Sequence, residues 1–299
     1  MERIPVVILF VITMAACLLS AGVRTYYSKS VSSTSAGYHL FNAVTSLICG
    51  VTLLALSGGD LQLSLYTVLT AMIFGVITAL KQITNSAALS IGPWSYTSMI
   101  VTLSTVFTAL SGALFFDETI RSAQYFGMVL MLLCLFLSVS KENDEQKKKT
   151  MRWFLLSLAC LIFCGGVGLM QKIHQNSEHR QELTMFLVIA FLCSFVFSVM
   201  NLFLLRARQG KKMQIFTQRP TRRLLVVLFV SGGVGIALNN LINLYLSGVV
   251  DSAVFFPIVN GGGLVLNTLS SMVFFREKLE PRQWCGMAVG MAATLLLCM

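Results

Sequence analysis

The chain has 299 residues, of which 56% are hydrophobic and only 11% charged. About a quarter of the residues in a typical soluble domain are charged, so this composition excludes an ordinary soluble enzyme and leaves little chain for a water-exposed module. The formal net charge of +10 lies in short Lys and Arg clusters between apolar runs, which is typical of membrane orientation signals and lipid-headgroup contacts, not of nucleic-acid binding.

Ten apolar segments follow one another along the chain, each close to the roughly 20 residues that a membrane-spanning helix needs. Their expected bounds are 4–22, 38–57, 65–90, 94–116, 122–140, 151–172, 183–205, 222–247, 252–275 and 282–298. A turn at Gly92-Pro93 separates the third segment from the fourth, because proline disfavours helix at the preceding residue. The sequence therefore predicts an all-α integral membrane protein with ten transmembrane helices.

The most polar segment of the chain is residues 141–149, close to its middle. We interpret residues 141–150 as a charged linker between two five-helix halves, residues 1–140 and 151–299.

The two halves repeat each other in sequence. Residues 115–128 align without gaps with residues 274–287, which lie 159 positions further on, and two Phe, a Glu, a Gln, a Gly and a Met are identical. Residues 79–85 align with residues 237–243, at an offset of 158. Identical polar residues at fixed spacing do not follow from apolar composition, so we interpret the match as a duplication. Because each half has an odd number of helices, the second half must enter the membrane with inverted topology, as in many secondary transporters.

The five-plus-five duplication and the connections that contain Glu118 and Glu277 resemble the ten-helix, EamA-type branch of the drug/metabolite transporter (DMT) superfamily. Residues 256–263 and the following 275–279 are similar to the ninth helix of that family and its exit. The resemblance covers nearly the whole chain, and it implies the fold and a transport role but no particular substrate. We expect both glutamates to cap the starts of helices, where a carboxylate favours the helix dipole.

Lys and Arg are distributed unevenly between the two sides of the membrane. If the chain has ten spans, seventeen of the 22 Lys and Arg residues lie on the side opposite the N-terminus and four lie on the N-terminal side, while Lys81 lies within a span. Cytoplasmic loops carry the excess of positive charge. The sequence therefore predicts a multi-pass protein of the cell membrane, in a bacterium the cytoplasmic membrane, with both termini extracytoplasmic.

Lys81 is the charged residue that the predicted bounds place well inside a span, where insertion of a lysine costs about 2.5–3.5 kcal/mol. One alternative is that the helix ends early and Lys81 reaches the headgroups. We favour a functional role, because apolar sequence continues past Lys81 and the equivalent place in the second half is also polar. Position 81 shares a helix face with Asn85, four residues on, as Asn239 does with Asn243.

An inverted repeat brings these two polar faces together near the membrane midplane. Asn260 and Asn267 are seven residues apart, share one face of the ninth helix and are expected beside them. The predicted substrate-binding residues are Lys81, Gln82, Asn85, Asn239, Asn240, Asn243, Asn260, Asn267, Tyr96 and Tyr245. The alternative is that the patches only hydrogen-bond helices together.

Two groups of glycines have open interpretations. Gly261-Gly262-Gly263 in the ninth helix either opens or bends the backbone or allows close helix packing. Gly286 and Gly290 form a small-xxx-small pair in the tenth helix, which favours packing, with a homodimer through helices 122–140 and 282–298 as a further expectation.

The twelve acidic residues all lie in or beside predicted loops, so no carboxylate is expected within the membrane to bind a cation or exchange protons. No zinc site and no pairing of a nucleophile with a base emerges from the histidines and cysteines. We therefore expect no catalytic residue, metal or cofactor, and a protein that is not an enzyme.

These features predict a secondary transporter, gradient-driven or facilitative, of a small organic metabolite that is neutral, zwitterionic or anionic. The mechanism would be alternating access around the central polar site. The expected partners are a small-molecule substrate and the lipid bilayer, with no nucleic acid. The alternatives are a flippase for a lipid-linked precursor and, from another class, an intramembrane enzyme or a non-transporting membrane protein.

Overall fold

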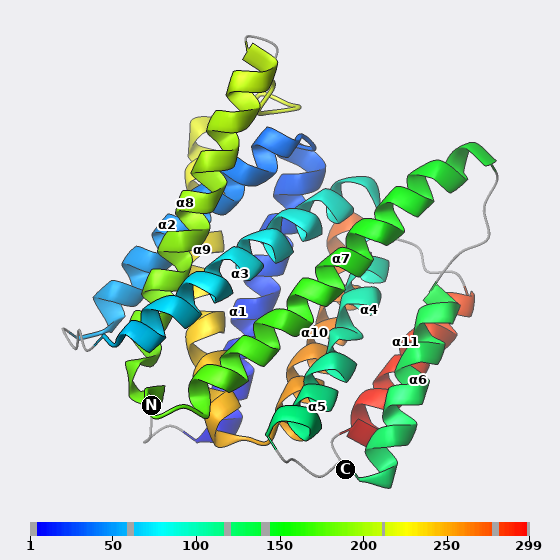
Figure 1. The fold of residues 1–299 in the computed structure, drawn as a ribbon. Helices are drawn as coiled ribbons and strands as arrows, with labels where there is room; N and C mark the ends of the chain where they lie inside the picture. The colour runs from blue at the N-terminus through cyan, green and yellow to red at the C-terminus, as the bar shows by residue number, and fades with distance from the viewer. Residues whose placement is uncertain are drawn as a thin grey trace.

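The computed structural model describes residues 5–58, 63–116, 121–138, 144–210, 213–276 and 281–297. In these ranges the chain forms long helices that run between the two ends of a bundle, and α1 begins at the same end at which α11 finishes (Figure 1). The first half consists of α1 (Val6–Tyr26), the π-helix η1 (Tyr27–Val31), α2 (Ser35–Leu56), α3 (Leu65–Ile91), α4 (Trp94–Thr102), α5 (Ser104–Phe115) and α6 (Ser122–Ser138). The second half consists of α7 (Asp144–Gln175), the short 3₁₀-helix η2 (Arg180–Glu182), α8 (Leu183–Gln209), α9 (Arg222–Val249), α10 (Ser252–Phe275) and α11 (Pro281–Leu297).

Eight helical segments of the described chain are long and apolar enough to cross a membrane, and α6 and α11 contain the shorter apolar segments Ser122–Leu133 and Trp284–Ala293. The predicted all-α integral membrane class is confirmed. The fold is compatible with ten helices, because α4 and α5 lie end to end as one interrupted helix (Figure 1).

Three helix bounds differ from those expected. Helix α1 continues as η1 to Val31 and does not end near residue 22, since no glycine or proline interrupts residues 23–31. The predicted single helix over 94–116 is interrupted at Leu103. Helix α7 begins at Asp144, inside the segment expected as a linker, and its two acidic first residues favour a helix start there.

The packing of the helices repeats between the two halves. Helix α3 packs against α7 and α8, and its counterpart α9 packs against α1 and α2 in the same way. Helix α2 packs along its own counterpart α8, and α6 along α11. These pairings are those that a two-fold relation between the halves requires.

Apolar side chains from both halves form the largest buried cluster, which joins α2, α3, α7, α8 and α9. Phe74 of α3 and Phe186 of α8 are buried members of this cluster, with ring centroids 5.1 Å apart. Gly286 and Gly290 of α11 are buried within the chain, so the predicted packing role fits them, while a homodimer through this region stays a prediction. The predicted caps Glu118 and Glu277 lie outside the described residues.

Candidate substrate cavity

A cavity of about 210 Å³ lies in the middle of the bundle, between α1, α3, α4, α7, α9 and α10. Eight of the ten predicted site residues line it: Lys81, Gln82, Asn85, Asn239, Asn240, Asn243, Asn260 and Asn267. The structure thus brings together side chains from both halves that the duplication predicts to be neighbours. That these side chains bind a substrate stays a prediction.

A second, smaller cavity of about 60 Å³ continues from the first toward α5 and α7. Lys81 and Asn260 line both cavities, as do the three asparagines of α9. The second cavity adds polar side chains of its own, among them Thr108 from α5 and Gln171 from α7. The two cavities therefore share a polar wall made of residues from α3, α9 and α10.

Lys81 lies in the interior of α3, which continues to Ile91, so an early end of this helix does not account for the charge. The backbone oxygen of Lys81 accepts a weak hydrogen bond from the Cys160 thiol, at 3.7 Å. Its ammonium group has no hydrogen-bond or ion-pair partner within the described residues and faces the cavity.

The asparagines of α9 are stacked along one helix face, as their spacing predicts. Asn243 Nδ2 donates to Asn239 Oδ1 at 3.2 Å, and Asn240 Nδ2 donates to the backbone oxygen of Ile236 at 2.9 Å. The remaining Asn243 Oδ1 is buried without a partner among the described residues. Part of this cluster therefore forms hydrogen bonds within α9, and Asn243 Oδ1 remains without a partner among the described residues.

Helix α10 contributes Asn260 and Asn267. Asn260 Nδ2 donates to Thr105 Oγ1 of α5 at 2.8 Å, which links the two halves beside the cavity. Asn267 Oδ1 is buried with no partner in the described part of the chain. One amide thus holds helices together, and the other presents an unused acceptor.

Arg24 is the charged residue of the cavity lining that lies outside the predicted set. Its side chain is only 6% exposed, and Nη2 donates to Gln82 Oε1 at 2.5 Å while Nη1 donates to the Gln82 backbone oxygen at 3.1 Å. The expected end of the first helix near residue 22 places Arg24 in a loop. The uninterrupted helical sequence that follows Arg24 could have indicated that it lies within the span.

Tyr96 and Tyr245, the other two predicted site residues, lie outside the cavity lining. Tyr96 packs among apolar residues of α4 and its neighbours, and Tyr245 packs beside Ile242 and Phe255. Their aromatic rings serve helix packing, which the sequence pattern could not distinguish from ligand contact.

The three glycines of α10 do not unwind the helix, which runs without interruption from Ser252 to Phe275. A Cβ on Gly262 would lie 3.1 Å from Met14 Sδ of α1, so close packing is the interpretation that the structure supports. The interruption occurs instead at Leu103, which corresponds to Gly262 at the offset of 159. There the helix tightens, with Leu103 N donating to Ile100 O and Val106 N to Leu103 O.

Loops from the two halves contact each other at both ends of the bundle. At one end, the loop after η1 meets the loop before α9: Ser33 N donates to Thr217 Oγ1 at 3.0 Å, and Thr217 N donates to the Val31 backbone oxygen at 3.0 Å. These donors and acceptors are all uncharged. We call this set the neutral latch.

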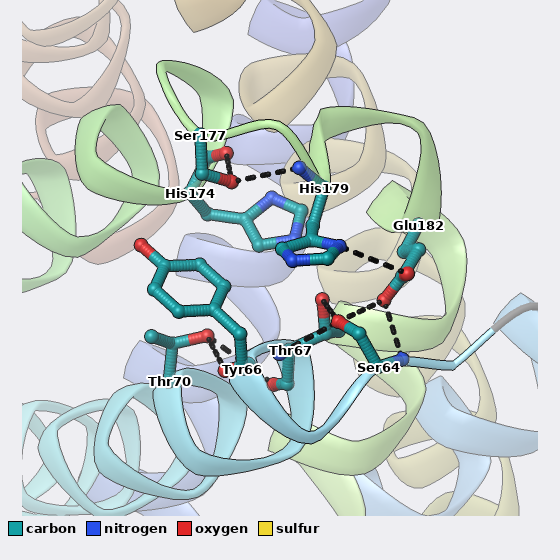
Figure 2. A network of polar contacts seen from close by, with 8 residues as sticks. All are labelled: Ser64, Tyr66, Thr67, Thr70, His174, Ser177, His179 and Glu182. Atoms are coloured by element: carbon teal, nitrogen blue, oxygen red, sulfur yellow. Dashed lines mark hydrogen bonds and ion pairs between the residues drawn. The ribbon is translucent and has the colours of Figure 1, made fainter.

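At the opposite end, the loop before α3 meets η2, as Figure 2 shows. The backbone nitrogen and the hydroxyl of Ser64 donate to Glu182 Oε2 at 2.9 and 2.8 Å. His179 Nδ1 lies 3.4 Å from Glu182 Oε1, and its ring stacks on Tyr66 at 5.4 Å between centroids (Figure 2). We call this set the acidic latch. Ser64 also caps α3, since its Oγ accepts from Thr67 N, so the latch holds the start of the helix that carries Lys81.

Comparison with known proteins finds one family that part of this chain is similar to. Residues 7–140 match the EamA-like transporter family. This confirms the resemblance over a segment that spans nearly all of the predicted first half. A solved structure, titled only as the crystal structure of a protein, aligns with 97% of this chain and 98% of its own, with a TM-score of 0.62 and 17% identity. At that identity the likeness shows the fold alone. No curated protein matches the chain.

The similarity of residues 7–140 to a transporter family and the eight long apolar helical segments of the described chain together indicate a multi-pass membrane protein. A transporter family is compatible with a protein that is not an enzyme. Among the described residues no group of three or more His, Cys, Asp or Glu side chains is placed to hold a metal ion.

Proposed function

We propose that the chain is a secondary transporter, gradient-driven or facilitative, that moves a small polar organic solute across the bacterial cytoplasmic membrane by alternating access. The observation that carries this proposal is the central cavity, where a lysine and seven side-chain amides from both halves converge in the middle of the bundle. Polar side chains at this depth are costly and normally mark a solute pathway. The match of residues 7–140 to a transporter family supports the same conclusion.

The two cavities and the two latches suggest how access alternates. The shared wall of Lys81, Asn260 and the asparagines of α9 would contact the solute from either cavity. Rocking of the halves would break one latch while the other stays closed, so that the solute reaches only one side at a time. The asparagine amides can donate or accept hydrogen bonds, which suits them to replace the water around a polar solute.

The proposal is tested by solute flux into proteoliposomes that contain the purified full chain, with Lys81→Ala and Asn239→Ala as variants. Both substitutions should reduce flux and ligand affinity in protein that remains folded. Their effects should be non-additive, because both side chains would contact one solute. Asn42→Ala is the matched control, since Asn42 is buried between α2 and α8 and donates to Ser194 and Ser198 away from the cavity. Wild-type affinity in both folded cavity variants would contradict the proposed site.

Access is tested separately with native thiols. Cys17 and Cys164 both line the main cavity, and Cys164 also lines the smaller one. In variants that retain only one of these cysteines, a membrane-impermeant maleimide should react from either side of the membrane, and saturating solute should slow the reaction. Labelling from one side only, under all solute conditions, would contradict alternating access.

A lipid-linked substrate is the second candidate, and one observation favours it. An apolar groove lined by residues such as Phe10 and Leu18 lies on α1 and α10, two helices that also line the cavity. An acyl chain could lie in that groove while a headgroup entered the cavity. Transfer of a fluorescent lipid between leaflets, with no flux of water-soluble solutes, would favour this function over the first.

A further inference from the structure

Two positively charged side chains line the central cavity, and no acidic side chain does. Arg24 comes from α1 and Lys81 from α3, so both belong to the first half. Neither forms an ion pair within the described residues. Buried charges in proteins are normally paired with an opposite charge. The cavity therefore offers two cations to a negative partner that its own walls do not supply.

The guanidinium of Arg24 is fixed by hydrogen bonds that use only some of its N–H donors. Its guanidinium donates to both the backbone and the side-chain oxygen of Gln82 and, at 3.4 Å, to Ser86 Oγ. The ring of Phe41 lies 5.4 Å from Cζ. These contacts use three of the five N–H groups of an arginine, all on Nη1 and Nη2. A guanidinium fixed in this way presents the remaining donors in a geometry suited to a carboxylate or a phosphate.

The cavity also contains unused acceptors. Three residues of the cavity lining each have a buried oxygen atom without a partner in the described chain: Asn243 Oδ1, Asn267 Oδ1 and Thr78 Oγ1. Thr78 is only 4% exposed. Buried acceptors without partners are unfavourable, so a ligand with hydrogen-bond donors would satisfy them.

We infer that the cavity binds a small organic anion that also carries a hydroxyl or amino group. Its acidic group contacts Arg24 and Lys81, and its donors contact Asn243 and Asn267. The cavity of about 210 Å³ has room for about seven water molecules at the volume each occupies in the liquid, which suits a small hydroxy acid, amino acid or phosphate ester. The inference rests on the proposed function only where it takes this anion to be the transported solute.

The test is the melting temperature of the purified full chain with probes of similar size and different charge: lactate, alanine, glycerol phosphate, neutral lactamide and cationic choline. At least one probe with an acidic group should raise the melting temperature, because a ligand of the native state stabilises it. Lactamide and choline should raise it less. Arg24→Gln and Lys81→Gln should each weaken binding about tenfold to a hundredfold, the range expected for a hydrogen bond to a charged group.

Lys172→Gln is the matched control. Lys172 is also a buried cation, 7% exposed, but it lies outside the cavity lining and donates to the Ser247 backbone oxygen. This variant should retain wild-type affinity for the acidic probe. Rescue of binding in Arg24→Lys, which keeps the charge, would further support an electrostatic role for position 24.

The outcomes separate the anion site from transport. Stronger binding of lactamide or choline than of every acid, no binding of any acid, or wild-type affinity in both charge-removing variants would overturn the anion site. Stabilisation by phosphatidylglycerol vesicles alone, without any soluble acid, would assign the two cations to a lipid headgroup and also overturn it. Charge-dependent acid binding without acid flux in proteoliposomes would support the anion site and contradict the proposed transport.

Discussion

The two halves of this protein share a packing arrangement but differ in the chemistry that they bring to the centre. Helix α3 packs on α7 and α8 as α9 packs on α1 and α2, yet Lys81 of α3 corresponds to Asn239 of α9. The first half supplies both cations of the cavity, and the second half supplies most of its amides. Apolar packing thus tolerates a change of polar side chain at equivalent positions, and the duplicated fold gives the cavity one basic side and one neutral side.

The two halves also differ at two other places. The latches at the two ends of the bundle have different chemistry, and the interrupted helix α4/α5 corresponds to the continuous helix α10. One end of the bundle is joined by hydroxyl and backbone groups, and the other by the Glu182 carboxylate. Leu103 interrupts its helix, whereas the corresponding Gly262 lies in a continuous helix that packs closely on Met14. The predictions below test whether each difference has a consequence.

The side of the membrane on which the N- and C-termini lie should give the largest effect, because a topology reporter is either active or inactive. By sequence, most Lys and Arg residues lie on the side of the membrane opposite the termini. Arg24 and Lys172 are buried in the structure, and leaving them out lowers the number of positive charges on each side by one, so the imbalance remains. A C-terminal reporter that is active only in the cytoplasm should therefore stay inactive. Strong cytoplasmic activity of the fusion would reverse the orientation and leave the fold unchanged.

Exchange of the polar residues between halves should give the next largest effect. Lys81→Asn should lower solute affinity about tenfold or more, since a hydrogen bond to a charged group contributes about 1.5–3 kcal/mol. Adding Asn239→Lys should restore part of the affinity, because both positions face the same cavity. Binding and flux of the single and double variants are the measurements, with melting temperature as the control for folding. No recovery in a folded double variant would show that the two positions are not interchangeable.

Sequence alone predicted the parts of this structure that depend on hydrophobic length and on the duplication. The apolar segments predict the helices, and the matched offset predicts that Lys81 lies near Asn239, beside which it lines the cavity. Arg24 falls outside the predicted site because a cation near the end of an apolar run is typical of a loop, although the absence of glycine and proline from residues 23–31 favours a continued helix. The interruption at Leu103 has no sequence pattern either, since leucine favours helices, and it depends on neighbours that the fold brings together.

Replacing Gly262 of α10 by leucine, the residue at the corresponding position 103 of the first half, should destabilise the packing of α10. In Gly262→Leu the new side chain would meet Met14 Sδ, which lies 3.1 Å from where a Cβ would be, and overpacking typically costs about 1–3 kcal/mol. The melting temperature should fall, and Met14→Ala in the same chain should recover part of the loss. The volume-conserving Leu103→Met is the control and should change it less. An unchanged melting temperature in Gly262→Leu would show that α1 and α10 are less closely packed than described.

Breaking the latches one at a time should shift access in opposite directions. Glu182→Ala removes the acceptor of both Ser64 hydrogen bonds, and Thr217→Val removes the acceptor of Ser33 N at the other end. Each change should raise the rate at which an impermeant maleimide reaches Cys164 from the end that was opened, and lower it from the other. Because both latches are partly solvated, we expect changes of a few-fold, equivalent to about 1 kcal/mol. Equal acceleration from both sides would indicate loosening of the whole bundle and no gate.

The smallest effect should come from hydrogen bonds that only join helices. Asn42 Nδ2 donates to Ser198 Oγ at 2.7 Å and to Ser194 Oγ at 3.1 Å, which links α2 to its counterpart α8 away from the cavity. Hydrogen bonds between membrane helices contribute about 0.6 kcal/mol each on average, so Asn42→Ala should lower stability by about 1 kcal/mol. Solute affinity should stay at the wild-type value, since the polar wall of the cavity is untouched. Titration calorimetry and thermal unfolding of the same preparation separate the two quantities. A loss of affinity larger than the loss of stability would mean that the α2–α8 interface moves with the cavity, and that the contrast between binding and packing polar groups does not hold in this fold.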